Sequence, residues 1–214
     1  MIKKYLAVFL FLAVLAGALT ACAPNYTDEF VALTDRFNEM NAEWSALMEE
    51  ETALNAASPD FAAIDTYYDH ATEVANAEVN ELTAMMDTLE SYQEGVNPQD
   101  YEGFMEVLND TVNTTEVALA YFSFDRGWAK AKTIKDDMNE LTIEWNDLNT
   151  DEKTLAVAEG YLASMNDLKD KLVSIKDEID AETYDVMIGN LDTTIEAFEE
   201  SIAALKAEEI NAEQ

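Results

Sequence analysis

Apolar residues recur every three or four positions along almost the whole chain, and this period limits the folds open to it. Further runs of the same spacing start at Leu82 and at Tyr101. The first run contains Phe30, Leu33, Phe37, Met40, Trp44 and Leu47. Such spacing places apolar side chains along one face of a helix, as in the seam of a helical bundle. No stretch alternates with period two for long enough to indicate a strand. The sequence therefore predicts an all-α, coiled-coil-like bundle.

Turn residues divide this periodic sequence into six helices. Pro59 and Pro98 are the only prolines after residue 24, and each follows a good helix-capping residue, Ser58 or Asn97. Three amphipathic helices of this length can close one core. We therefore predict two tandem three-helix units. The predicted helices span residues 27–56, 59–94, 98–121, 124–149, 151–178 and 181–208.

The two predicted units resemble each other in sequence. The segment Asn38–Leu47 matches Asn139–Leu148 at an offset of 101, and this alignment places Trp44 on Trp145. Farther along, the offset is 83, which places Leu82 on Met165 and Tyr101 on Tyr184. The difference of 18 residues, 101 minus 83, corresponds to one insertion in the first copy around residues 55–75. The matched order of these residues predicts an internal duplication.

The junction between the copies decides how they are connected. Residues 119–130 contain no Pro and a single glycine, Gly127, which costs about 1 kcal/mol inside a helix. The third helix can therefore run directly into the fourth, or the chain can break at Ser123 or Gly127 and fold the copies side by side. The continuous arrangement resembles spectrin-like tandem repeats, in which successive three-helix bundles share a helix and each first helix carries a Trp. Trp44 and Trp145 have that place here.

Residues 1–21 have the composition of an export signal. Lys3 and Lys4 precede an uncharged apolar run from Tyr5 to Leu15. This run is shorter than the roughly 20 residues that a membrane-spanning helix needs, and small residues follow it. We therefore expect residues 1–21 to be a signal peptide that is removed, with an uncleaved membrane helix as the alternative.

Leu19, Thr20, Ala21 and Cys22 form a motif that resembles the lipobox of prokaryotic lipoproteins. The resemblance implies cleavage before Cys22, a diacylglyceryl group on its sulfur, and acylation of the new amino group by a fatty acid such as palmitate. Two or three acyl chains anchor a protein stably, whereas one chain holds it only marginally. The resemblance thus implies a chain anchored on the cell membrane or the outer membrane and facing outside the cytoplasm. In this division, residues 22–122 form the anchored first unit and 123–214 the second.

The net charge excludes several classes of protein. The chain has 45 acidic and 12 basic residues, a net charge of −33. A nucleic-acid binder needs a basic face. Electrostatic binding to anionic lipid also needs a basic face. Removal of Lys3 and Lys4 with the signal leaves 45 acidic and 10 basic residues, a net charge of −35. We therefore expect no nucleic-acid binding, and membrane contact through the lipid anchor.

The single histidine, His70, is the centre of the only candidate metal site in the sequence. On a helix, Asp69 and Glu73 lie on the same face as His70, so a carboxylate–histidine cluster is conceivable. Paired Glu-x-x-His motifs, which build metal sites in helical bundles, are absent. A solvated helix position explains these residues equally well. The chain also lacks a Gly-rich phosphate loop and a nucleophile elbow. We therefore expect no enzymatic activity and no cofactor besides the covalent lipid on Cys22.

A local concentration of basic residues follows the junction. Arg126 and Lys130 flank Trp128 in a chain that is otherwise acidic. These residues can relieve repulsion near Asp136 and Asp137, or they can form a contact for an acidic partner. Trp128 itself can either wedge between the two bundles or lie exposed as part of that contact.

These observations predict a cell-envelope lipoprotein that acts as a non-catalytic binding, spacing or assembly module, with an envelope protein as its partner. The alternative is an envelope lipoprotein that binds a small ligand or a divalent cation, near His70 or in the space between the bundles. The sequence does not identify the partner or the ligand.

Overall fold

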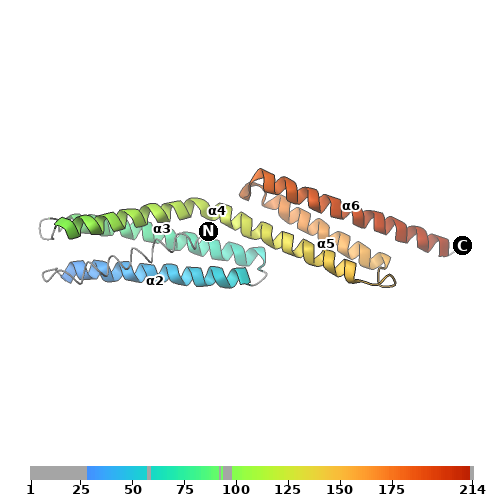
Figure 1. The fold of residues 1–214 in the computed structure, drawn as a ribbon, viewed down its shortest axis with the longest axis horizontal. Helices are drawn as coiled ribbons and strands as arrows, with labels where there is room; N and C mark the ends of the chain where they lie inside the picture. Colours follow the sequence, from blue (N-terminus) through green and yellow to red (C-terminus); the bar gives the residue numbers. More distant parts are fainter. Residues whose placement is uncertain (1–27, 57–58, 92, 94–97, 213–214) are drawn as a thin grey trace. The chain divides into compact units, whose positions relative to one another are not determined.

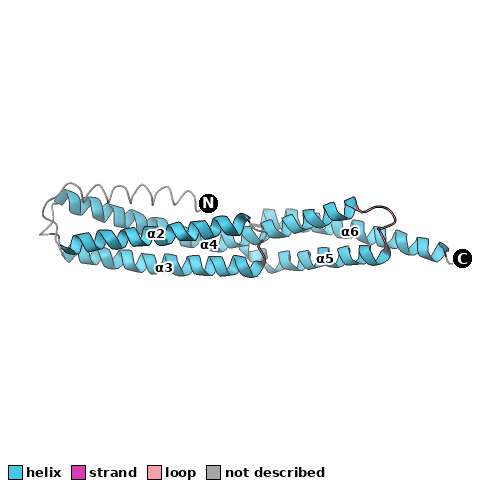
Figure 2. Cartoon of the chain, turned by 90° about the horizontal axis from the view of Figure 1, so that it is seen from below, coloured by secondary structure: helices cyan, strands magenta, loops and turns pink. Residues whose placement is uncertain are grey.

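The computed structural model describes residues 28–56, 59–91, 93 and 98–212, and its regular structure is helical (Figure 1). These described residues form five α-helices and contain no strand, as the colouring of Figure 2 shows. The predicted all-α bundle is therefore confirmed. The internal duplication stays a prediction.

The chain divides into two compact units, Met1–Asp125 and Arg126–Gln214, which we call unit 1 and unit 2. The sequence placed the corresponding boundary after residue 122. Unit 1 contains α2, α3 and the first part of α4, and unit 2 contains the remainder of α4 with α5, η2 and α6. The bounds are α2 Asp28–Ala56, α3 Phe61–Ser91, α4 Pro98–Asp147, α5 Leu155–Ser174, the 3₁₀ turn η2 Lys176–Glu178, and α6 Ala181–Ala212.

Helix α4 passes through the junction. It runs for 50 residues without a break at Ser123 or at Gly127. The backbone of Gly127 has no positive φ, so a turn does not explain this glycine. A Cβ atom at Gly127 would lie 2.1 Å from the backbone oxygen of Glu178. The missing side chain therefore lets the end of η2 pack closely against α4 within unit 2.

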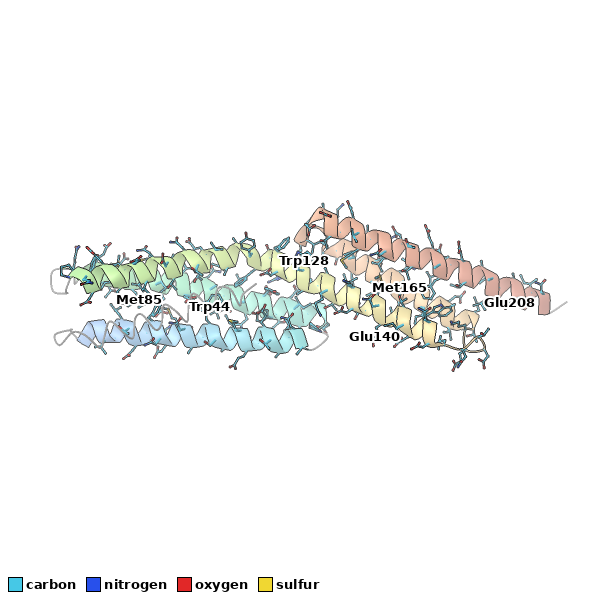
Figure 3. All side chains as sticks on the ribbon, in the orientation of Figure 1. Trp44, Met85, Trp128, Glu140, Met165 and Glu208 are labelled. Carbon is cyan, nitrogen blue, oxygen red and sulfur yellow. The ribbon has the colours of Figure 1, made fainter. Side chains whose placement is uncertain are left out.

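The core of unit 1 is built from the face that the apolar period predicted. Each of its three helices contributes, and the rings of Phe37 and Phe104 meet edge to face with centroids 6.3 Å apart. Met85, labelled in Figure 3, belongs to this core. One cluster of buried residues in this core consists of Phe37, Met40, Leu82, Met85, Leu89, Phe104, Val107 and Leu108. The burial of these apolar side chains, which come from all three helices, provides the main stabilising free energy of the unit.

The core of unit 2 follows the same plan. Met165 of α5, labelled in Figure 3, is fully buried, as is Ile134 of α4. The other large buried apolar residues of α5, η2 and α6, with the turns between them, are Leu168, Leu172, Ile175, Ile179, Leu191, Ile195, Phe198 and Ile202. Apolar side chains thus close this unit along the inner faces of all three helices.

Side-chain caps begin three of the helices. The backbone N–H of Ala63 donates to Asp60 Oδ1 at 2.8 Å, so Asp60 caps α3 one turn before Ile64 enters the core. Ser58, the cap expected from the sequence, lies outside the described residues. Asp180 caps α6 through the N–H of Thr183 at 2.8 Å. Thr154 caps α5.

Candidate functional site

The lipobox residues Leu19, Thr20, Ala21 and Cys22 lie outside the described residues. The structure therefore neither supports nor opposes cleavage and lipidation, which stay predictions from the sequence. Within the described part of the chain, none of the helices has an apolar run long enough to span a bilayer.

His70 lies on the exposed side of α3 and faces α2. Its Nδ1 lies 3.2 Å from Glu50 Oε2, and about half of each side chain is exposed. The sequence had instead grouped His70 with Asp69 and Glu73 of its own helix. Among the described residues, no group of three or more His, Cys, Asp or Glu side chains has the geometry of a metal site. The pair formed by His70 and Glu50 therefore joins two helices at the surface.

The three residues singled out at the junction have different environments. Trp128 is 42% exposed, whereas Lys130 is buried and Arg126 is partly buried. Lys130 Nζ lies 3.2 Å from Glu178 Oε2, in an ion pair between α4 and η2. The same Glu178 supplies the backbone oxygen that approaches Gly127. Lys130 therefore holds η2 in place within unit 2, and Trp128 is the exposed residue of this group.

The most unusual chemistry of unit 1 is a carboxyl group in its core. Glu78 of α3 is only 5% exposed and lies between Trp44 of α2 and Thr115 of α4, both of which are also buried. The indole Nε1–H of Trp44 donates a hydrogen bond to Glu78 Oε2. The hydroxyl of Thr115 lies 3.4 Å from the same oxygen. One polar residue from each helix thus meets in the centre of the unit, and we call Trp44, Glu78 and Thr115 the polar triad.

Burial decides the protonation state of this triad. Loss of hydration raises the pKa of Glu78 to about 8, although the hydrogen bond from Thr115 opposes the change. The neighbouring carboxylates of Glu43 and Glu81 raise this pKa further. Glu78 is therefore mainly a neutral carboxylic acid at pH 7 in the folded unit.

An ion-pair network lies beside the triad at the surface of α2 and α3. Arg36 is the only basic residue between positions 22 and 122. Its Nη2 donates to Glu81 Oε2 at 2.7 Å, and its Nη1 donates to Glu39 Oε2 at 2.8 Å. The hydrogen bonds from Arg36 hold the pKa of Glu81 below its usual range. Arg36 thus pairs with carboxylates at the surface. Glu78 in the core is instead stabilised in its neutral, protonated form.

Unit 2 has aromatic rings at the positions that the predicted repeat would align with the triad. The offset of 101 places Trp44 on Trp145, and the offset of 83 places Glu78 on Tyr161 and Thr115 on Phe198. The Trp145 ring lies 5.5 Å from Tyr161 and 5.1 Å from Phe198, and the latter two rings are stacked. The three residues of each set therefore lie close together within their own unit. Only the set in unit 1 contains a buried acid.

Unit 2 also has a shallow groove between α4 and α5. Its volume is about 470 Å³. Carboxylates from both helices face it together with a hydroxyl and one amine. The lining residues include Asp137, Glu140, Glu144, Ser164, Asp167 and Lys171. Such a lining suits a cationic group rather than an anion.

No protein-family model, no curated protein and no solved structure matches this chain.

Sequence reasoning missed the polar triad, although a signal for it was present. Glu78 lies four residues before Leu82 and seven before Met85, so it occupies the buried phase of α3. An acidic residue at such a position is rarely buried without a hydrogen-bonding partner. The spacing alone, however, does not show which residues of α2 and α4 would face it.

Proposed function

We propose that this chain is a lipid-anchored envelope protein whose two acidic helical units form a non-catalytic binding, spacing or assembly module. The observation that carries the proposal is the sequence Leu19-Thr20-Ala21-Cys22 after a positively charged start and an apolar run. Lipid on Cys22 would hold the units at a membrane surface despite a charge that anionic lipids repel. An envelope protein is the proposed partner.

The described helices support a binding role in two ways. Their inner faces are filled by apolar side chains, which leaves the outer faces for contacts. Trp128 is an exposed aromatic residue, a type that often contributes strongly to protein interfaces. We therefore place the partner contact on the face of α4 that carries Trp128.

Fractionation of intact cells tests the anchor, and cross-linking tests the partner. The wild-type chain should sediment with membranes and take up labelled palmitate, whereas Cys22→Ser should do neither. A photo-cross-linking residue at position 128 should capture one specific envelope protein, and the same residue at the exposed position 190 of α6 serves as the control. A Cys22→Ser variant that stays membrane-bound and labelled would contradict the anchor, and equal capture at both positions would contradict the contact.

The groove of unit 2 favours a second candidate function, binding of a small organic cation, since its carboxylates do not form a group with the geometry of a metal site. Asp137, Glu140 and Glu144 of α4 face Asp167 of α5 across it. Calorimetric titration of the full chain with a diamine tests this function. Saturable binding that is lost in Glu140→Gln supports it, and heats that do not saturate contradict it.

A further inference from the structure

The Thr115 hydroxyl has one proton to donate and two acceptors within reach. Its oxygen lies 3.0 Å from the backbone oxygen of Thr111 and 3.4 Å from Glu78 Oε2. The shorter distance assigns the proton to the hydrogen bond with Thr111. A lone pair of Thr115 Oγ1 is then available to accept a proton from Glu78.

A protonated Glu78 completes an unbroken hydrogen-bond chain through the core. The O–H on Glu78 Oε2 would then donate to Thr115 Oγ1, Thr115 would donate to the carbonyl of Thr111, and the indole of Trp44 donates to the same Oε2. An ionised Glu78 would compete with Thr111 for the single proton of Thr115. The burial of Glu78, which is 5% exposed, is what favours the neutral carboxyl group at this site.

The charged groups that act on Glu78, one from α2 and one from its own helix, are both acidic. Glu43 of α2 and Glu81 of α3 both oppose its ionisation. Arg36 pairs with Glu81 and lies 3.8 Å from Glu43, and its hydrogen bonds go to Glu81 and Glu39. From α4, Thr115 contacts Glu78 and Thr111 contacts Thr115, and neither threonine titrates. Ionisation inside the closed unit is therefore opposed both by burial and by charge.

We propose that Glu78 is a proton-binding site that couples the closure of unit 1 to pH. The three helices close around the neutral carboxyl group. When they open, Glu78 enters water and releases its proton to solvent. Because the ionised form is favoured in the open unit, each rise in pH favours opening until Glu78 ionises in the closed unit as well.

The direction of the effect follows from the two pKa values of the same group. The pKa is 4.5 for an exposed glutamate and about 8 for Glu78 in the closed unit. The stabilising effect of the proton is therefore complete below pH 4.5, declines between pH 4.5 and pH 8, and is lost above pH 8. Ordinary carboxyl groups have finished titrating by about pH 6. A change in the stability of unit 1 above that pH therefore reports on Glu78.

Hydrogen exchange of the full chain between pH 6 and pH 8, corrected for the intrinsic exchange rate, tests this proposal. The protection of core amides in α2 and α3 should fall about tenfold per pH unit. The protection in α5 and α6 should stay constant, since unit 2 has Tyr161 and Phe198 at the matching positions. Equal slopes in the two units would overturn the proposal, and this comparison needs only the wild-type chain.

Substitutions test whether Glu78 itself causes the pH dependence of protection in unit 1. In Glu78→Gln the pH slope of unit 1 should disappear, because the amide cannot ionise. Glu90→Gln, an exposed glutamate of the same helix, should keep the wild-type slope. Histidine also titrates in this window, so His70→Gln is a second control and should keep the slope. A Glu78→Gln variant that retains the slope, or a His70→Gln variant that loses it, would contradict the proposal.

Discussion

The indole nitrogen of Trp44 donates its proton to the carboxyl group of Glu78 in the core of unit 1. The tryptophan that the sequence alignment pairs with it, Trp145 of unit 2, instead lies against the ring of Tyr161 with centroids 5.5 Å apart. The two tryptophans thus make different interactions, since Trp44 is buried whereas Trp145 and Tyr161 are half-buried. Unit 1 depends on a satisfied polar group, and unit 2 depends on aromatic packing.

Trp44→Phe should therefore destabilise the protein beyond the effect of the smaller ring. Phenylalanine keeps an apolar ring but has no N–H, so Glu78 loses a buried hydrogen-bond donor. The expected cost is about 1–3 kcal/mol of unfolding free energy, measured by urea denaturation at pH 7. Trp145→Phe is the matched control, because Trp145 makes ring contacts with Tyr161 and Phe198. Equal losses in the two variants would count against the role of the indole N–H.

Gly127→Ala should destabilise unit 2, although alanine is the better helix former. The added Cβ would lie 2.1 Å from the backbone oxygen of Glu178, a distance that requires the backbone to move. We expect a loss of about 1–3 kcal/mol from this overpacking. Gly160→Ala is the control, since its Cβ meets nothing within 4 Å, and it should stabilise the chain by up to about 1 kcal/mol. The comparison is made by thermal unfolding, and a stabilised Gly127→Ala variant would show that η2 does not pack there as described.

The ion pair of Lys130 and Glu178 should respond unequally to removal of its two partners. Glu178→Ala leaves the buried amine of Lys130 without its carboxylate, and we expect a loss of about 3 kcal/mol. Lys130→Met keeps an unbranched apolar side chain and leaves Glu178 about one-third exposed to water, so the loss should be below about 1 kcal/mol. Lys132→Ala removes an exposed pair with Asp136 and should change stability by less than about 0.5 kcal/mol. If chemical denaturation gave the same loss for Glu178→Ala and Lys130→Met, the buried amine would not be the cause.

Moderate salt should raise the melting temperature of the protein. The net charge of −33 gives strong repulsion between carboxylates in the compact state. At about 0.5 M NaCl the screening length falls well below its value at low salt, so this repulsion weakens. Calorimetric scans of the same preparation at low and high salt measure the effect. A melting temperature that stays the same or falls would show that repulsion does not limit stability.

The apolar period predicted most of the fold because burial of a helix face requires that period. It predicted a helix over 151–178, whereas α5 begins at Leu155 and ends at Ser174. The difference at the start has a local cause: Glu152 accepts a hydrogen bond from the backbone N–H of Asn149 at 2.8 Å and stabilises a turn. At the other end, the N–H of Ile175 bonds to Leu172 and Val173, which tightens the last turn.

The candidate sites were harder to predict than the helices. The charge of Lys130 predicts relief of repulsion near Asp136 and Asp137 or contact with an acidic partner, but its partner is Glu178, which is 48 residues away and is brought to it only by the fold. Glu78 was missed for the same reason, since its partners lie 34 and 37 residues away on other helices. A one-dimensional pattern gives the phase of a residue on its own helix. It does not give the residue that faces it.

The lipid on Cys22 is the central claim about function, and intact-mass analysis of the protein purified from membranes tests it most directly. The account predicts an amino-terminal peptide that begins at Cys22 and carries the added mass of a diacylglyceryl group, with or without a further acyl chain. A chain that still begins at Met1, or one cleaved elsewhere with an unmodified Cys22, would contradict it.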